Sequence, residues 1–123
     1  MSGEGSTVVA IDADDADVVA LLDDEYARAT LVLTYREELA ADDIAERLDA
    51  APSTVYDRLS RLTDHDLVTE QQQLDLDGHH YKTYRARLDC VVAELTADGF
   101  EVRIDREPSD PADRLTAAFD DLR

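Results

Sequence analysis

Residues 41–67 read ADDIAERLDAAPSTVYDRLSRLTDHDL, and this stretch decides the fold. The apolar residues of its two halves recur at helical spacing and predict two inner faces: Ile44, Ala45 and Leu48, then Val55, Leu59 and Leu62. The first helix is predicted from Asp42, a suitable N-cap, to Leu48. The second is predicted from Pro52 to about His65, because a proline at the first helical position loses no hydrogen bond.

Alternating residues after the second helix predict a β-hairpin. Leu67–Leu74 and His79–Ala86 have the residue types of strands and flank a turn at residues 75–78, whose Asp-Gly pair favours a hairpin. Before residue 41, apolar positions at helical spacing predict another helix over Asp17–Arg36, with a break near Asp23. The order of elements is therefore helix, helix, helix, hairpin.

The remaining sequence predicts further elements around this unit. Apolar residues alternate over Val91–Leu95 and Phe100–Asp105 and predict a second hairpin that buries one face. A last helix carries one apolar stripe: Ala112, Leu115, Phe119 and Leu122. We expect an α+β protein with a flexible arm over residues 1–16, a helical and hairpin domain over 17–88, and a dimerising hairpin and helix over 89–123.

The chain is strongly acidic but has the composition of a folded protein. Its 123 residues include 30 acidic and 12 basic side chains, which give a formal net charge of -18, while 44% of the residues are hydrophobic. Lys82 is the only lysine. High acidity with almost no lysine resembles proteins of salt-loving archaea, in whose cytoplasm a Debye length below about 3 Å screens like charges. An acidic protein from an organism of ordinary salinity is the alternative.

Several classes of protein and site are not indicated. Cys90 is the only cysteine, which excludes an internal disulfide and a zinc site of several cysteines, and we interpret it as a small buried residue rather than a redox switch. Adjacent His79 and His80 on a strand cannot easily share a metal ion, and His65 is predicted to cap its helix. The sequence shows no membrane-spanning run, phosphate loop or nucleophile–base pair. We expect a cytoplasmic protein without enzymatic activity, cofactor, bound metal or membrane contact.

The helical pair resembles a known signature. The residues that carry it are Ala41–Leu48, Ala51–Leu59, Leu62 and Asp66–Val68. They are similar to winged helix-turn-helix regulators of the ArsR, PadR and MarR type over about Leu39–Arg87, with a departure at Asp66, where most members have glycine. Gly78–Tyr81 and the PADRLT run at residues 111–116 resemble small winged-helix regulators of halophilic archaea, which include an oxidative-stress regulator.

The resemblance implies a winged helix-turn-helix with an additional C-terminal β-hairpin and dimerisation helix, which regulates transcription by binding double-stranded DNA. The helix at about residues 52–65 enters the major groove in such proteins, and the wing, here about 74–82, contacts the backbone or the minor groove. One exposed flank of the helix is predicted to consist of Thr54, Asp57, Arg58 and Arg61. The other DNA-contact candidates are Ser53, Tyr56, His79, His80, Lys82, Arg85 and Arg87.

The predicted DNA-contacting segment, residues 53–87, has little of the net negative charge of the chain. Residues 53–87 hold six acidic and five basic side chains, so almost all of the net charge of -18 lies elsewhere in the chain. Asp57 is expected to repel phosphate unless it accepts a hydrogen bond from cytosine N4 or holds a monovalent cation that bridges to DNA. The cation hypothesis predicts that binding weakens little, or even strengthens, as KCl rises.

We expect a homodimer, because one helix reads few base pairs. Its operator should be an approximate inverted repeat with half-sites about 34 Å apart. The predicted interface joins the first helix to the C-terminal residues Leu115, Phe119 and Leu122. Two alternatives stay open. One is a winged-helix protein-interaction module of the transcription machinery, and the other is a small-molecule sensor with a pocket between the second hairpin and the dimer helices.

Overall fold

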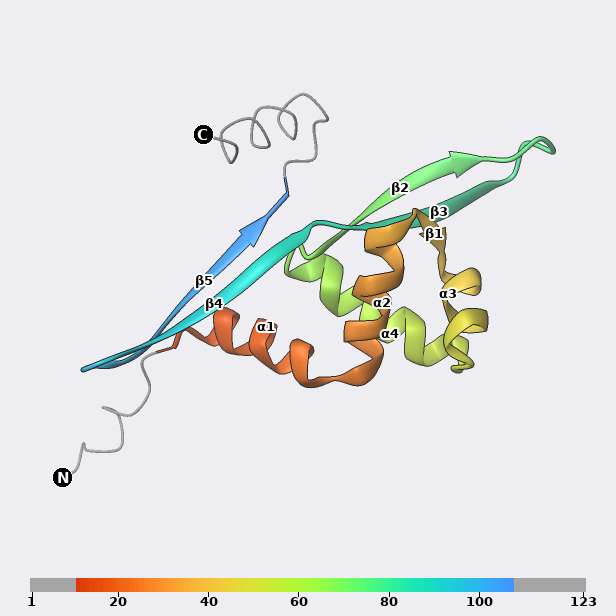
Figure 1. Cartoon of the computed structure of the whole chain (residues 1–123). Coiled ribbons are helices and arrows are strands. Elements are labelled where there is room, and N and C mark those ends of the chain that lie inside the picture. Colours follow the sequence, from red (N-terminus) through yellow and green to blue (C-terminus); the bar gives the residue numbers. More distant parts are fainter. Residues whose placement is uncertain (1–10, 108–123) are drawn as a thin grey trace.

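A computed structural model describes residues 11–107 and shows helices on one face of a small sheet, with a second, long hairpin running away from them (Figure 1). Residues 1–10 of the predicted arm lie outside the described residues. So does the predicted C-terminal helix with Leu115, Phe119 and Leu122.

The first predicted helix is two helices that meet at Asp24. α1 spans Ala13–Asp23 and α2 spans Glu25–Arg36. Asp24 has an extended backbone, and its side chain accepts a hydrogen bond from the Ala27 N–H at 2.7 Å, so it caps α2. The predicted break is confirmed, whereas α1 begins before the predicted Asp17.

The stretch at residues 41–67 contains the predicted pair of helices. α3 spans Ala41–Leu48 and α4 spans Pro52–Asp64, with Pro52 at the beginning of α4. The prediction of Asp42 as an N-cap is wrong, because Ala40 occupies that position and Asp42 lies in the first turn. An acidic residue there still interacts favourably with the N-terminal end of the helix dipole.

At the carboxyl end of α4, Asp66 forms the turn and Arg106 donates hydrogen bonds to the backbone carbonyl groups. Asp66 has a φ of 58°, a left-handed conformation that aspartate tolerates better than most residues, so the turn forms without the glycine of similar sequences. Arg106 Nη2 donates to the His65 carbonyl at 2.7 Å, and its Nε donates to the Asp66 carbonyl at 3.2 Å. His65 occupies the predicted C-cap position of α4, and its imidazole Nδ1 lies 2.8 Å from the Asp14 carboxylate on α1.

Two antiparallel sheets complete the fold. β2 (Val68–Leu74) and β3 (His80–Ala86) form the predicted first hairpin, called the wing from here on, and β1 (Leu39–Ala40) pairs with the other edge of β3. β4 (Leu88–Thr96) and β5 (Gly99–Arg106) form the predicted second hairpin as a separate sheet. The sequence does not predict β1, because a strand of two residues has no alternating pattern.

The core lies between the helices and the β1–β3–β2 sheet. Its largest fully buried apolar side chains are Val18, Ile44, Val55, Leu59, Leu62 and Leu67. The predicted inner faces of α3 and α4 are therefore confirmed. Tyr84 and Ala86 of β3 join this core from the sheet. Within residues 11–107, no helix combines the length and apolarity needed to cross a membrane.

One buried hydroxyl group in α2 lacks a hydrogen-bond partner among the described residues. Thr30 is fully buried and its Oγ1 is unpaired. The equally buried Thr34 hydroxyl donates to the Thr30 carbonyl at 2.7 Å. Since an unpaired buried polar group costs about 1 to 3 kcal/mol, Thr30 weakens the core in which it lies.

We expect Thr30→Val to raise the free energy of unfolding by about 1 kcal/mol, because it removes an unsatisfied hydroxyl group with little change in volume. Thr34→Val is the matched control and should give no such gain, because the hydroxyl that it removes is hydrogen-bonded. Denaturant unfolding of both variants at one KCl concentration measures the difference. Equal gains, or a loss for Thr30→Val, contradict this account.

Candidate nucleic-acid interface

α4 presents one exposed stripe on its outer side. After Pro52, which begins the helix and is also exposed, the exposed residues are Ser53, Tyr56, Asp57, Ser60, Arg61 and Asp64. They recur at spacings of three and four residues, opposite the buried face of the helix. Thr54 and Arg58, which were expected on an exposed flank, are half-buried. The prediction missed Ser60 and Asp64, although helical spacing places both opposite the core.

Arg58 faces inward because Asp24 holds it against the junction of α1 and α2. Its Nε and Nη2 donate to the Asp24 carboxylate at 2.8 and 3.2 Å, and its Nη1 donates to Asp57 at 2.8 Å. The guanidinium carbon also lies 5.9 Å from the ring centroid of Tyr26, within the range of a cation–π interaction. With its side chain only 22% exposed, Arg58 positions α4 and is not free to read bases in this structure.

The contact between Asp24 and Arg58 changes the acidity of both groups. The hydrogen bond from Arg58 lowers the pKa of Asp24 below its ordinary 3.8, against the opposing effect of burial, and the Ala27 N–H adds to the lowering. The hydrogen bond to Asp24 likewise raises the pKa of Arg58. Asp24 therefore stays ionised to lower pH than an ordinary aspartate.

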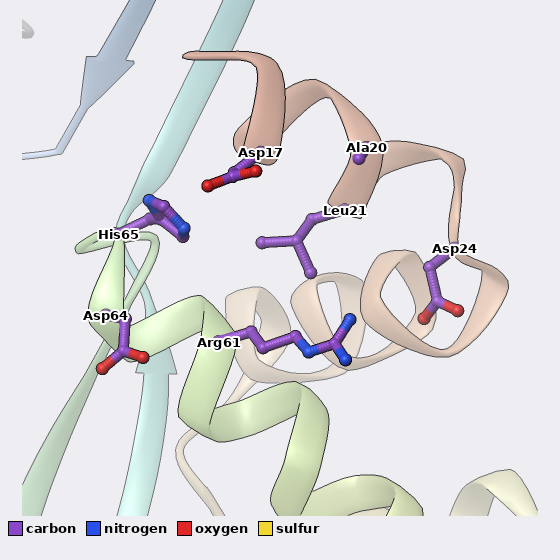
Figure 2. A pocket seen from close by; sticks show the side chains of 7 residues that line it. All are labelled: Asp17, Ala20, Leu21, Asp24, Arg61, Asp64 and His65. Carbon is purple, nitrogen blue, oxygen red and sulfur yellow. The ribbon is translucent and has the colours of Figure 1, made fainter. Parts of the chain in front are cut away.

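Arg61 is the more accessible arginine of α4. Its side chain is 60% exposed, and its Nε lies 3.3 Å from the Asp57 carboxylate one turn earlier. An exposed pair of this kind contributes about 0 to 1 kcal/mol, so Arg61 can exchange it for DNA at little cost. Figure 2 shows Arg61 lying along a pocket of about 320 Å³ between α1 and the end of α4, lined also by Asp24 and, at the other end, by Asp17 and His65.

A shallow groove separates α4 from the wing. Two hollows of about 280 and 210 Å³ share Tyr56, Lys82 and Tyr84 as lining residues. His80 lines the first hollow and Ser60 lines the second. The structure thus brings three of the predicted residues from the helix and the wing, Tyr56, His80 and Lys82, to one continuous surface.

The other predicted basic residues of the wing lie elsewhere. Lys82 and Arg85 are three positions apart on β3, so their side chains leave opposite faces of the sheet. Arg87 Nη2 donates to the Glu107 carbonyl at 3.3 Å and so joins the two ends of the second hairpin. The three side chains that were expected to contact phosphate together therefore do not share one surface.

The wing turn gathers three potential metal ligands. Asp75, Asp77 and His79 offer ligand atoms that lie within 4.8 Å of one another. The Asp75 Oδ1 accepts hydrogen bonds from the N–H groups of Asp77 and His79 at 2.9 and 2.8 Å. All three side chains are exposed, and exposed acidic groups often lie together without an ion. From the sequence, His79 and His80 were considered beside Asp77; the structure replaces His80 with Asp75, and the signal for this set is the spacing of two residues around an Asp-Gly turn.

Cys90 on β4 is half-buried and hydrogen-bonded. Its Sγ donates to the Asp105 carboxylate at 3.3 Å across the hairpin. This hydrogen bond to an anion is the main cause that raises the pKa of Cys90, and it lowers the pKa of Asp105. Because the thiolate is the reactive form, the site disfavours reaction of this thiol, in agreement with a structural residue.

Comparison with known proteins agrees with this arrangement of helices and wing. Residues 21–71, from the end of α1 to the middle of β2, match a family model described as a helix-turn-helix domain. The fold is a winged helix-turn-helix. The predicted α+β winged helix with an additional hairpin is therefore confirmed, and its predicted dimerisation helix lies outside the described residues.

The winged helix has a similar counterpart among solved structures. Reduced HlyU from Vibrio cholerae matches with a TM-score of 0.51 and 18% sequence identity, and the match covers 60% of this chain and 73% of that chain. At this identity the similarity concerns the fold alone. No curated protein matches the chain.

We expect the contribution of Asp24 to stability to disappear in acid. Its carboxyl group has a lower pKa in the folded protein than in the unfolded chain, so the contribution is present above about pH 4 and is lost as pH falls through the folded pKa. Asp24→Asn should lower the free energy of unfolding by about 1 to 3 kcal/mol at neutral pH, and this deficit should shrink below about pH 4.

Asparagine isolates the ion pair because it keeps the ability to cap α2. The control is Asp23→Asn, which changes the adjacent exposed carboxylate and should leave the stability nearly unchanged. Denaturant unfolding across this pH range at constant KCl measures both. A deficit for Asp24→Asn that stays the same at every pH shows that the charge of Asp24 does not hold α4.

Proposed function

We propose that the chain is a sequence-specific DNA-binding transcriptional regulator that places α4 in the major groove and the β2–β3 wing on the backbone or minor groove. The observation that carries this proposal is the exposed stripe of α4 beside the wing groove, in a segment that matches a helix-turn-helix domain. Tyr56, Ser60 and Arg61 offer hydroxyl and guanidinium donors on the stripe. Across the groove, Lys82 forms an exposed ion pair with Glu70 at 3.7 Å, which it can exchange for a phosphate at little cost. These donors suit phosphate oxygens and base edges.

The regulator acts as a homodimer on an approximately palindromic operator. Two copies of α4 then enter successive major grooves on one side of the duplex, with half-sites about 34 Å apart. Leu115, Phe119 and Leu122 stay the predicted C-terminal part of the interface. The two-fold symmetry of the protein would be mirrored in the DNA sequence.

Operation in concentrated salt is part of the proposal. Asp57 and Asp64 share the exposed stripe with Arg61, and carboxylates at this position repel phosphate. With a net charge of -18, the chain also repels DNA at longer range until salt screens it. A monovalent cation between Asp57 and a phosphate removes the nearest repulsion, and the cytoplasm of a halophilic archaeon would supply it.

We expect Arg61→Gln to weaken binding of the specific operator by about ten- to a hundredfold, because one arginine contact to a base is worth about 1 to 3 kcal/mol. Arg61 is exposed, so the variant should keep its stability. The operator is first selected from random DNA fragments in multimolar KCl, and affinity is then measured by fluorescence anisotropy.

Arg58→Gln is the matched comparison, because the two arginines lie one turn apart on α4 but differ in burial. It should lower the stability of the protein, whereas Arg61→Gln should not. Lys82→Gln should weaken binding to every sequence alike, because a phosphate contact carries no sequence information. Selection that enriches no DNA fragment rejects the regulator and favours the protein-interaction module.

Asp57→Asn tests the cation. If the wild type takes up one cation at Asp57 on binding, the logarithm of its affinity should fall less steeply with the logarithm of KCl concentration, by about one unit of slope, than that of the variant. Asp64→Asn removes the other carboxylate of the stripe and should keep the slope of the wild type. Equal slopes for wild type and Asp57→Asn rule out a cation at this residue.

A further inference from the structure

The β4–β5 hairpin has one apolar face and one charged face. Its cross-strand register pairs the apolar residues with one another: Val91 with Ile104, Ala93 with Val102, and Leu95 with Phe100. The opposite face pairs Val92 with Arg103 and Glu94 with Glu101. Because side chains alternate between faces, every charged residue of these pairs lies on the second face. Over residues 91–95 and 100–104 the first face carries no charged side chain, in a chain with a net charge of -18.

This apolar face is covered only at its base. Val91 and Ile104 pack against the core of the winged helix. Further along the hairpin, Leu95 is 74% exposed and Phe100 is 46% exposed. These strands were predicted to bury one face. Within residues 11–107, only the base of that face, at Val91 and Ile104, is covered. A two-stranded hairpin is only marginally stable by itself in water, so its outer half needs a partner.

We propose that a second copy of this chain covers the face, with the two hairpins packed against each other across a two-fold axis. This inference rests on the homodimer of the proposed function and names its central contact. Two sheets pack face to face at about 10 Å when their inner residues are apolar, as here. An isologous contact between charge-free faces also lets two acidic chains meet with the least electrostatic repulsion.

The chain leaves β5 at the covered end of the hairpin. The Glu107 N–H donates to the Arg87 carbonyl at the base of the hairpin, so the chain leaves β5 beside the half that is already covered. Phe100 lies about 20 Å from that end, at about 3.3 Å for each residue of β5. Residues 108–123 are long enough to cover this distance, so the choice of a second copy rests on the charge-free residues 91–95 and 100–104 in a chain with a net charge of -18.

The proposed contact also leaves α4 and its groove with the wing uncovered in both copies. Figure 1 shows the turn of the β4–β5 hairpin at the opposite end of the molecule from the turn of the wing. α4 and its groove with the wing lie between these two ends. Two copies joined through their hairpins therefore hold their DNA-facing surfaces apart, as two half-sites require.

Sedimentation velocity of the full chain in multimolar KCl tests this interface. We expect the wild type to be a dimer, and the double variant Leu95→Gln/Phe100→Gln to raise the dissociation constant of the dimer by about a hundredfold or more, because two large apolar side chains of each copy lose their burial. The control Val92→Gln/Glu94→Gln changes the opposite face of β4 and should stay dimeric. Circular dichroism and thermal melting show that both variants remain folded.

Cross-linking gives a second measurement that does not depend on dissociation. In a Cys90→Ser background, Ala93→Cys lies on the apolar face and Val92→Cys lies on the opposite face. A short bismaleimide, which can span stacked sheets too far apart for a disulfide, should join two copies of the Ala93→Cys protein and not of the Val92→Cys protein. Equal cross-linking of the two proteins overturns the proposal.

Other outcomes separate this interface from the function. A monomeric wild type, or a hairpin variant that remains a dimer while Leu115→Gln/Phe119→Gln dissociates, overturns the hairpin contact even if the operator is bound. A hairpin variant that dissociates into monomers but still binds a half-site fragment with low affinity supports both proposals. If no DNA is bound but the hairpin variant still dissociates, the interface stands and the regulator proposal fails.

Discussion

The bond between Asp24 and Arg58 is the constraint on which the position of α4 depends. One carboxylate ends α1, caps α2 and receives two hydrogen bonds from an arginine on α4. Three helices therefore meet at one charged group, with Tyr26 beside the guanidinium. The apolar core sets which side of α4 faces inward, and this ion pair adds a polar contact beside the core. An arginine that was expected to contact DNA thereby holds α4 in place.

Most of the fold is predictable because its periodicities are strong and local. The buried residues of α3 and α4 repeat at helical spacing, and an Asp-Gly turn marks the wing. The failures have local causes. Ala40 caps α3 only through its backbone, a position without a side-chain signal, and β1 exists only because β3 pairs with it. The carbonyl groups of His65 and Asp66 after α4 accept hydrogen bonds from Arg106, which is distant in sequence and which no local pattern indicates.

The candidate site is less predictable than the fold, because side-chain partners decide it. Helical phase alone would have placed Ser60 and Asp64 outside, and strand parity alone would have separated Lys82 from Arg85. No local pattern, however, shows that Arg58 faces Asp24, which is far away in sequence. Basic residues counted along a segment therefore overstate the positive charge of its surface when carboxylates from other elements already neutralise them.

Arg106 connects the β4–β5 hairpin to the carboxyl end of α4, a contact that the sequence of the hairpin does not indicate. It ends β5 and donates hydrogen bonds to the carbonyl groups of His65 and Asp66, so it links the strand to the end of α4. In the proposed dimer, the two packed hairpins would then act as the spacer between the two copies of α4. The lengths of β4 and β5 would then set the distance between the two half-sites of the operator. Bending of the hairpin would shift the carboxyl end of α4 through the hydrogen bonds of Arg106.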